Sequence, residues 1–268
     1  MTQFLETAGG RIAYTVAGAG PLVICVPGMG DIKETYRFLV PILVDAGYRV
    51  VTMDIRGHGE TSTGWDSHSQ TAIGRDITAL IEHLGGPAVV VGQSFTPDSA
   101  LVAATVLPDQ VTATVLIAPW ARTPRLNPLV RLAQAAVVRV PRLWAMFYTS
   151  LYPGTKPADF AQYRKTLTAA LRRPDGMAGL AAMANPASRD AADYRSRPAQ
   201  PALIVMGTAD PDFSDPRAEA EAMAADLRAP VEIAMIDGAG HYPQAQAATE
   251  TGQAIVEFLD RTVRGADA

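Results

Sequence analysis

The sequence predicts an α/β protein built on a doubly wound, mostly parallel sheet of eight strands. Three observations carry this prediction: apolar runs of strand length alternate with helical periodicities, an alternating hairpin opens the chain, and 268 residues suffice for one large domain with an insertion. Strands that alternate with helices pair in parallel, because each helix returns the chain to the edge where the previous strand began. A chain of this length buries roughly 70–75% of its unfolded surface, so it needs no disulfide.

The first predicted element is an antiparallel hairpin. Residues 2–7 and 11–17 alternate between apolar and polar side chains, and Gly9 and Gly10 join the two segments. A hairpin at the start of an otherwise parallel arrangement has to lie at the margin of the sheet. We therefore expect it to supply an antiparallel edge.

The remaining strands and helices alternate along the chain. Strands covered on both faces are predicted where apolar runs are continuous, at 21–26, 49–54, 88–92, 111–119, 201–207 and 231–237. Helices are predicted where apolar side chains recur every three or four positions, at 36–48, 70–86, 97–107, 215–227 and 248–263. The first of these helices contains Pro41 and has a stop signal at Gly47.

Residues 120–198 break this alternation. Helical patches in the segment are split by prolines and by Gly154, and no continuous apolar strand occurs there. We interpret the segment as a helical cap that is inserted after the sixth strand and closes over the strand ends. The chain then divides into a core of residues 1–119 and 199–268 and a cap of residues 120–198.

The composition narrows the classes of partner. The net charge is −4, from 23 basic and 27 acidic residues, so nucleic acid and anionic membrane surfaces are not expected partners. The N-terminus lacks the basic head and apolar core of a signal peptide, and no apolar run reaches the ~18 residues that span a bilayer. The one cysteine, Cys25, cannot form an internal disulfide. We expect a cytoplasmic monomer or homodimer that acts on a small molecule.

Three residues with complementary chemistry follow predicted strands. Ser94 comes after the strand 88–92, Asp210 after 201–207, and His241 after 231–237. Parallel sheets bind ligands beyond the carboxyl ends of their strands, where these residues can meet. A serine hydroxyl is a poor nucleophile until a histidine removes its proton, and a carboxylate orients that histidine. The sequence therefore predicts a Ser-His-Asp catalytic triad.

The residues around Ser94 favour a sharp turn between a strand and a helix. GQSFT at 92–96 nearly matches the nucleophile-elbow pattern G-x-S-x-G, and Pro97 suits the first turn of the following helix. Thr96 stands where the pattern has its second glycine. We expect this threonine either to re-aim the serine slightly, to place a hydroxyl near the site, or to mark a weak catalyst.

The sequence resembles the α/β-hydrolase family over nearly its whole length, because four of its loops are similar to family loops and occur in the family's order. VPGMGD at 26–31 is similar to the oxyanion loop, with Pro27 where the family usually has histidine, and DIRGHGETS at 54–62 is similar to the D-x-R-G-H-G-x-S loop. MGTADPD at 206–212 and GAGHYP at 238–243 resemble the loops that carry the acid and the base. The resemblance implies a capped member such as a small esterase, a lactonase, a carbon–carbon bond hydrolase or a haloperoxidase-like enzyme.

The resemblance also implies roles for individual residues. Backbone N–H groups of Met29 and Phe95 would form the oxyanion hole, and Asp210 would be the triad acid. Asp212 and Asp215 compete for that role, but Asp210 lies closest to the strand end. Aromatic residues that we expect against the substrate are Trp120, Tyr148 and Tyr242.

We predict a serine hydrolase that cleaves a small or medium hydrophobic ester, thioester or lactone. Alternatives are carbon–carbon hydrolysis, lyase or perhydrolase chemistry on the same triad, and a catalytically weak ligand-binding protein. Epoxide or haloalkane hydrolysis is disfavoured, because the resemblance implies an aspartate at the elbow for those relatives. No cofactor and no metal are expected, since no two of the four histidines have a metal-binding spacing and no phosphate loop opens a helix.

Overall fold

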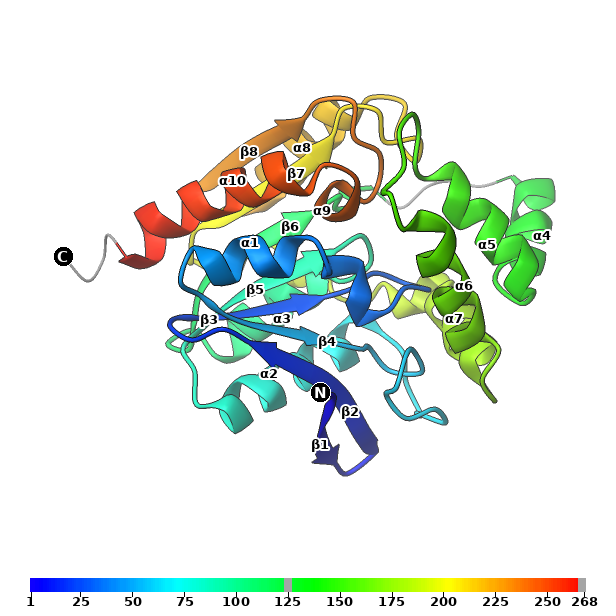
Figure 1. Ribbon diagram of the computed structural model, residues 1–268, viewed down its shortest axis with the longest axis horizontal. Helices are drawn as coiled ribbons and strands as arrows, with labels where there is room; N and C mark the ends of the chain where they lie inside the picture. Colours follow the sequence, from blue (N-terminus) through cyan, green and yellow to red (C-terminus); the bar gives the residue numbers. More distant parts are fainter. Residues whose placement is uncertain (123–126, 265–268) are drawn as a thin grey trace.

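An eight-stranded sheet forms the centre of the molecule in the computed structural model, which describes residues 1–122 and 127–264 (Figure 1). The strand order is β1-β2-β4-β3-β5-β6-β7-β8. β1–β2 and β2–β4 pair antiparallel and all other neighbours pair parallel, which confirms the predicted sheet and its antiparallel edge. The strands are β1 (Gln3–Thr7), β2 (Gly10–Ala17), β3 (Leu22–Val26), β4 (Arg49–Met53), β5 (Ala88–Gln93), β6 (Val111–Ile117), β7 (Ala202–Gly207) and β8 (Val231–Ile236).

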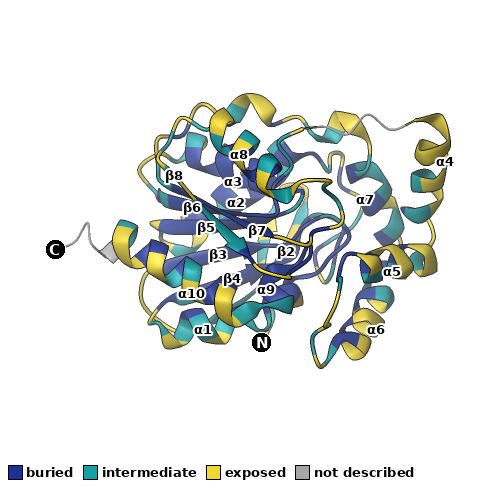
Figure 2. Cartoon of the chain, turned by 90° about the horizontal axis from the view of Figure 1, so that it is seen from above, coloured by how far each residue is buried: buried dark blue, intermediate teal, exposed yellow. Residues whose placement is uncertain are grey.

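Helices cover both faces of the sheet. Figure 2 shows α2, α3 and α8 on one face and α1, α9 and α10 on the other. Every residue of β3, β5 and β7 is buried as a result, which explains why these strands read as unbroken apolar runs. The covering helices are α1 (Leu39–Asp45), α2 (Gln70–Leu84), α3 (Pro97–Val106), α8 (Pro216–Asp226), α9 (Pro243–Gln246) and α10 (Ala248–Leu259).

The first helix is shorter than the sequence predicts. Instead of one helix over 36–48, a 3₁₀ turn, η1 (Lys33–Tyr36), precedes α1, and α1 ends at Asp45. Pro41 is thereby placed in the first turn of α1, where a backbone N–H has no partner inside the helix. Gly47 has φ 85°, a left-handed conformation that ends the helical path.

Between β6 and β7 the chain forms only helices in the described residues. They lie beyond the carboxyl ends of the strands, at the right of Figure 1, and we call residues 127–198 the cap helices. Residues 123–126 of the predicted insertion 120–198 lie outside the described part. No helix in the described chain combines the length and apolar character needed to cross a bilayer. The helices are α4 (Pro128–Val137), α5 (Pro141–Ser150), α6 (Phe160–Leu171), α7 (Gly176–Met183), η2 (Pro186–Ser188) and η3 (Ala192–Tyr194).

Candidate active site

Ser94 occupies the corner between β5 and α3. Its φ is 59°, a left-handed conformation that costs a non-glycine residue roughly 1–3 kcal/mol. The turn is tight: a Cβ added to Gly92 would lie 2.6 Å from the Thr96 carbonyl oxygen. The Ser94 N–H donates to the carbonyl of Ile117 on β6 at 2.8 Å. The neighbouring strand thus holds the strained residue in place.

Thr96 uses its hydroxyl to fasten this corner. The hydroxyl oxygen accepts a hydrogen bond from the Gln93 N–H at 2.9 Å and lies 3.0 Å from the carbonyl oxygen of Val26, to which it donates. The residue is fully buried, and its φ and ψ of −96° and −2° need no glycine. Thr96 therefore joins the elbow to the end of β3, and its hydroxyl does not face the cavity as a free group.

The structure brings Ser94, His241 and Asp210 into one chain of hydrogen bonds. His241 Nε2 lies 2.8 Å from Ser94 Oγ, and His241 Nδ1 lies 2.7 Å from Asp210 Oδ2. His241 and Asp210 are almost completely buried. The second carboxylate oxygen of Asp210 accepts the N–H of Asp212 at 3.0 Å, which fixes the carboxylate plane. This arrangement can deprotonate a serine hydroxyl and stabilise the imidazolium that results.

A second carboxylate lies beside the imidazole. Asp212 Oδ2 is 3.6 Å from His241 Nδ1, farther than Asp210, while Asp215 caps α8 by accepting the Ala218 N–H. Burial disfavours the imidazolium and lowers the pKa of His241, but Asp210 and Asp212 outweigh burial and raise that pKa to about 9. The site therefore favours the protonated imidazole that proton transfer from serine creates.

Backbone contacts anchor the loop that carries His241. The His241 carbonyl accepts a hydrogen bond from Gln93 Nε2 at 3.0 Å, and the His241 N–H donates to the carbonyl of Leu151 at 3.1 Å. Gly240 has no room for a side chain, since an added Cβ would lie 2.4 Å from that same Leu151 oxygen. The end of α5 and the base-bearing loop are thus in direct contact.

The loop after β3 is held from two sides. The Gly30 N–H donates to His58 Nε2 at 3.0 Å, and the Gly30 carbonyl accepts the indole N–H of Trp144 at 2.9 Å. Burial lowers the pKa of His58 to about 4, so its ring stays neutral and keeps the lone pair that accepts the Gly30 N–H. Among the described residues, neither the Met29 nor the Phe95 N–H donates to another protein atom. Both predicted oxyanion donors are unpaired in this arrangement.

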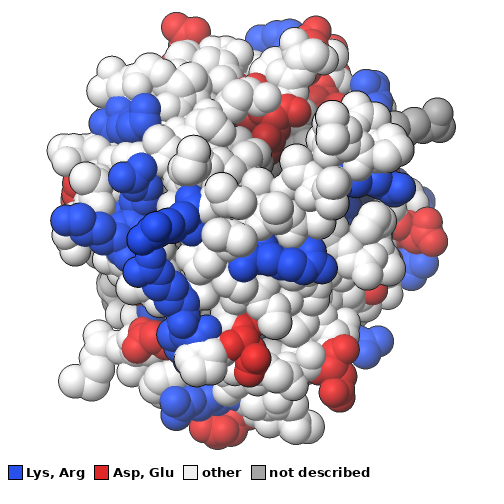
Figure 3. All heavy atoms as spheres, turned by 90° about the vertical axis from the view of Figure 1, so that its right-hand side faces the viewer, with Lys and Arg blue, Asp and Glu red and all other residues white. Residues whose placement is uncertain are grey.

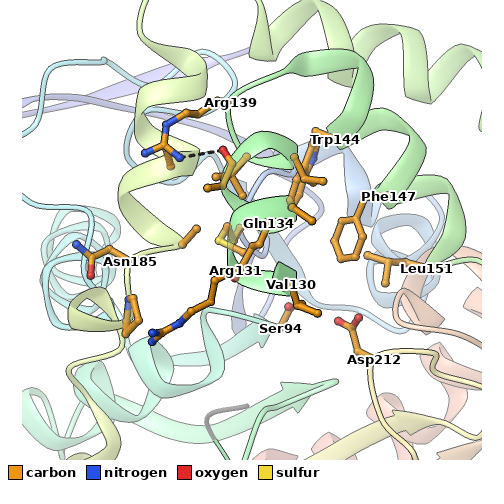
Figure 4. Close-up of a pocket in the computed structure, with 18 of the residues that line it drawn as sticks. Ser94, Val130, Arg131, Gln134, Arg139, Trp144, Phe147, Leu151, Asn185 and Asp212 are labelled. Atoms are coloured by element: carbon orange, nitrogen blue, oxygen red, sulfur yellow. Dashed lines mark hydrogen bonds between the residues drawn. The ribbon is translucent and has the colours of Figure 1, made fainter. Parts of the chain in front are cut away.

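A cavity of about 750 Å³ lies between the sheet edge and the cap helices, within the range of small-molecule sites. Figure 4 shows Ser94 and Asp212 at one end and Val130 and Arg131 of α4 above them. Trp120 and Tyr242, which the sequence analysis expects against the substrate, are among the residues that line the cavity. The other lining residues are mainly apolar and include Met29, Val137, Val138, Trp144, Phe147, Leu151, Ala181 and Pro186.

Tyr148 has a different position from the one expected. It is fully buried and does not line the cavity. Its hydroxyl donates to the buried carboxylate of Asp31 at 3.1 Å, and the Tyr163 hydroxyl donates to the same carboxylate. Both tyrosine hydroxyls are directed at the carboxylate of Asp31, which is fully buried and also accepts the Ile32 N–H. They join the cap helices to the loop after β3.

Arg189 is a cavity-lining residue that the sequence analysis did not single out. It follows η2, in a segment without regular periodicity, so no local pattern marked it. Arg131 on α4 and Arg139, two residues after the end of α4, also line the cavity. Only the folding of the cap over the sheet edge brings these cations near Ser94.

One group of residues has the donor types of a metal site. Ligand atoms of Asp210, Asp212 and His241 lie within 4.8 Å of one another. The Nδ1 atom of His241 and one oxygen of Asp210 are bonded to each other, however, and Nε2 contacts Ser94. These atoms are committed to the hydrogen-bond chain, and a bound cation would have to break it.

Comparisons with known proteins match this fold. A family model described as the alpha/beta hydrolase family matches residues 23–254. A 2-(acetamidomethylene)succinate hydrolase of Mesorhizobium japonicum is 28% identical over 266 residues, covering 94% of this chain and 93% of that protein. Epoxide hydrolase A of Mycobacterium tuberculosis is 25% identical, with 96% of each chain covered. A thermophilic esterase from Thermogutta terrifontis superposes with a TM-score of 0.81 at 24% identity, covering 98% of this chain and 99% of that one.

Proposed function

Because the chain belongs to the alpha/beta hydrolase family, we propose that it is a serine hydrolase that cleaves an ester-type bond. The bond is that of a small or medium, largely apolar ester, thioester or lactone. The observation that carries the proposal is the pair of hydrogen bonds, 2.8 and 2.7 Å long, from Ser94 through His241 to Asp210. Residues 120–198 act in this proposal as a cap over the strand ends.

In the first half of the reaction, His241 Nε2 takes the proton of Ser94 Oγ while that oxygen attacks the carbonyl carbon. The N–H groups of Met29 and Phe95 stabilise the negative charge that develops on the carbonyl oxygen. Losing one such donor typically costs roughly 10²–10³ in rate. His241 then gives its proton to the leaving oxygen or sulfur, and an acyl-enzyme on Ser94 remains.

In the second half, water repeats the sequence with the roles reversed. His241 removes a proton from the water, the hydroxide attacks the acyl carbon, and the proton returns to Ser94 Oγ as the carboxylic acid leaves. Asp210 keeps the imidazole in the tautomer that presents Nε2 to the serine. Asp212 adds a second negative charge beside the imidazolium, which favours the proton transfers from serine and from water to His241.

The cavity supports a small-molecule substrate. Its volume of about 750 Å³ and its mainly apolar walls fit an acyl group and a leaving group of moderate size. The net charge of −4 argues against nucleic acid or an anionic membrane surface as a partner. A cytoplasmic monomer or homodimer is part of the proposal.

The same triad can serve other reactions, and carbon–carbon bond hydrolysis, lyase and perhydrolase chemistry are the alternatives on this site. Epoxide hydrolysis is less well supported, because serine and not aspartate stands at the elbow. Product analysis on a panel of esters, lactones and vinylogous diketones separates these reactions, since only an acyl hydrolase releases one acid and one alcohol or thiol from an ester.

The decisive experiment is active-site labelling with a fluorophosphonate probe. We expect wild-type protein to gain one probe adduct on Ser94, located by peptide mass spectrometry, and the Ser94→Ala variant to gain none. A ligand-binding protein without catalytic power would remain unlabelled in both forms. Labelling of Ser94 without turnover of any ester would favour one of the alternative reactions.

A further inference from the structure

Arg189 is a cation in the cavity whose side chain has no hydrogen-bond or ion-pair partner in the described chain. Other partly buried arginines are paired: Arg195 binds both oxygens of Asp98, and Arg56 binds both oxygens of Asp76. Arg189 is partly buried and lines the same cavity as Ser94 and His241, yet none of its five side-chain donors has a protein acceptor among the described residues.

Two aromatic rings fix the position of this guanidinium. The Arg189 Cζ atom lies 5.5 Å from the ring centre of Phe95 and 5.4 Å from that of Trp120. A guanidinium held over aromatic faces stays planar and keeps its edge free for hydrogen bonds. Phe95 directly follows Ser94, and Arg189, Ser94 and His241 line the same cavity, so a ligand there can meet both the cation and the nucleophile.

The two carboxylates whose charges act on Arg189, Asp98 and Asp212, already have other partners. Asp98 forms the bidentate pair with Arg195, and Asp212 lies 3.6 Å from His241 Nδ1. Burial lowers the pKa of Arg189 although both carboxylates oppose this, but an arginine remains charged in a protein. A charged group that is partly withdrawn from water without a partner costs free energy, which an anionic ligand would recover.

We propose that Arg189 binds a carboxylate group of the substrate, so that the enzyme prefers ester-type substrates with a free carboxylate. This inference rests on the proposed hydrolase function. One guanidinium edge matches the two oxygens of one carboxylate in bidentate fashion. A doubly charged phosphate fits less well, because Asp212 shares the cavity and would repel the second negative charge.

The rest of the cavity agrees with an anion that carries an apolar body. Apolar side chains of the cap helices form most of the wall, and Arg131 and Arg139 add positive charge nearer the surface. Figure 3 shows lysine and arginine side chains gathered across the middle of the face that carries the cap helices. Such a field draws anions toward the cavity mouth although the whole chain has a net charge of −4.

The first test compares matched substrates on wild-type protein. Monophenyl adipate is compared with its neutral carboxamide, phenyl adipamate, which places the charge on the acyl side. Meta-acetoxybenzoate is compared with meta-acetoxybenzamide, which places it on the leaving-group side. We expect kcat/KM to be roughly 10- to 100-fold higher for the carboxylate in at least one pair. This is the ratio that a hydrogen bond to a charged group typically contributes.

The second test removes the cation. In Arg189→Met we expect that preference to fall to near unity, because kcat/KM falls more for the carboxylate substrate than for its neutral partner. Arg189→Lys should restore part of the preference, because it keeps the charge but not the bidentate edge. Arg142→Met is the matched control: Arg142 is exposed on α5 outside the cavity lining, and its loss should leave the preference unchanged.

The outcomes separate this inference from the proposed function. Turnover of the neutral esters without any preference in wild type overturns the carboxylate site but leaves the hydrolase intact. A preference that survives in Arg189→Met and disappears in Arg131→Met also overturns the assignment, because the carboxylate would then bind Arg131. No turnover of either member of a pair, together with no probe adduct on Ser94, contradicts the hydrolase itself. If Arg189→Met is unstable, the wild-type comparison and Arg189→Lys decide alone.

Discussion

The carboxyl edge of the sheet and helix α4 of the cap differ in how fully their side chains are packed and bonded. At the sheet edge, Asp210, His241 and Thr96 are buried and their polar atoms are hydrogen-bonded. In the cap, α4 has no buried residue, and Leu129 and Leu132 are 76% and 70% exposed. A packed, bonded group has one arrangement of low free energy, whereas an exposed helix tolerates several. The sheet edge therefore holds these side chains in one geometry, whereas α4 has no comparable packing among its residues.

The largest expected effect tests the core. Replacing Ser94 with alanine should lower kcat by a factor on the order of 10⁴–10⁶, because the nucleophile is lost while the fold remains. Ester hydrolysis under saturating substrate measures this effect, and circular dichroism checks folding. Ser99→Ala is the matched control: Ser99 is buried in α3 and its hydroxyl has no hydrogen-bond partner in the described structure, so its loss should leave kcat unchanged. Near-normal turnover in Ser94→Ala would show that Ser94 is not the nucleophile.

A second prediction concerns Asp31, at the junction between core and cap. Burial raises the pKa of its carboxyl from 3.8 to about 6, although hydrogen bonds from Tyr163, the Ile32 N–H and Tyr148 oppose the rise. The folded state then holds the proton more tightly than the unfolded chain. The free energy of unfolding should therefore fall as the pH rises from about 4 to about 6, and this contribution amounts to about 3 kcal/mol.

Asp31→Asn has no carboxyl to titrate, so it should lack this fall. Urea unfolding of both proteins at about pH 4 and about pH 7 measures the difference, with the exposed Asp66→Asn as control. An identical pH dependence in wild type and Asp31→Asn would show that this carboxyl does not bind its proton more tightly in the folded protein.

A smaller effect is expected from the second carboxylate of the site. Asp212→Asn removes a negative charge that helps to raise the pKa of His241 to about 9, so that pKa should fall. The general base must be unprotonated to act, and the rising limb of kcat/KM should move to lower pH by roughly one unit. A pH–rate profile of wild type and variant measures the shift. An unmoved or oppositely moved limb would mean that Asp212 does not act on His241.

The smallest effect tests the cap against the core directly. Leu132→Ala on α4 should change the free energy of unfolding by less than about 0.5 kcal/mol, because the side chain is 70% exposed. Leu203→Ala on β7 removes a side chain that is 2% exposed and should cost about 2–5 kcal/mol. Chemical denaturation compares the two. Similar losses would show that α4 is packed against something in solution.

The sequence predicted the parts of the molecule that local patterns determine. Unbroken apolar runs gave the buried strands, and the residues that follow them gave Ser94, Asp210 and His241, which the structure brings together. The predicted helix over 36–48 was too long, because helical periodicity alone does not show that a proline has to lie in the first turn. The role of Thr96 also escaped prediction, since its hydroxyl bonds to Val26, far away in the chain.

The cap was harder to predict because its contacts depend on how it docks on the core. Tyr148 was expected against the substrate, but its hydroxyl faces Asp31, and only the packed structure shows which side of α5 meets the cavity. No sequence pattern marked Arg189 as a site residue, because an arginine in an irregular segment is usually exposed to solvent. An unpaired cation becomes visible only when every neighbouring carboxylate is known to be engaged elsewhere.

The hydrogen bond from the Trp144 indole to the Gly30 carbonyl joins α5 to the loop that carries Met29, the proposed oxyanion donor. If α5 lifts to admit a molecule, Gly30 loses this partner and the adjacent Met29 N–H is less firmly held. In the proposed mechanism, the oxyanion hole is therefore fully ordered only while α5 contacts this loop. Substrate selectivity would then depend on cap closure, because an ester that does not fill the cavity would not hold the cap closed.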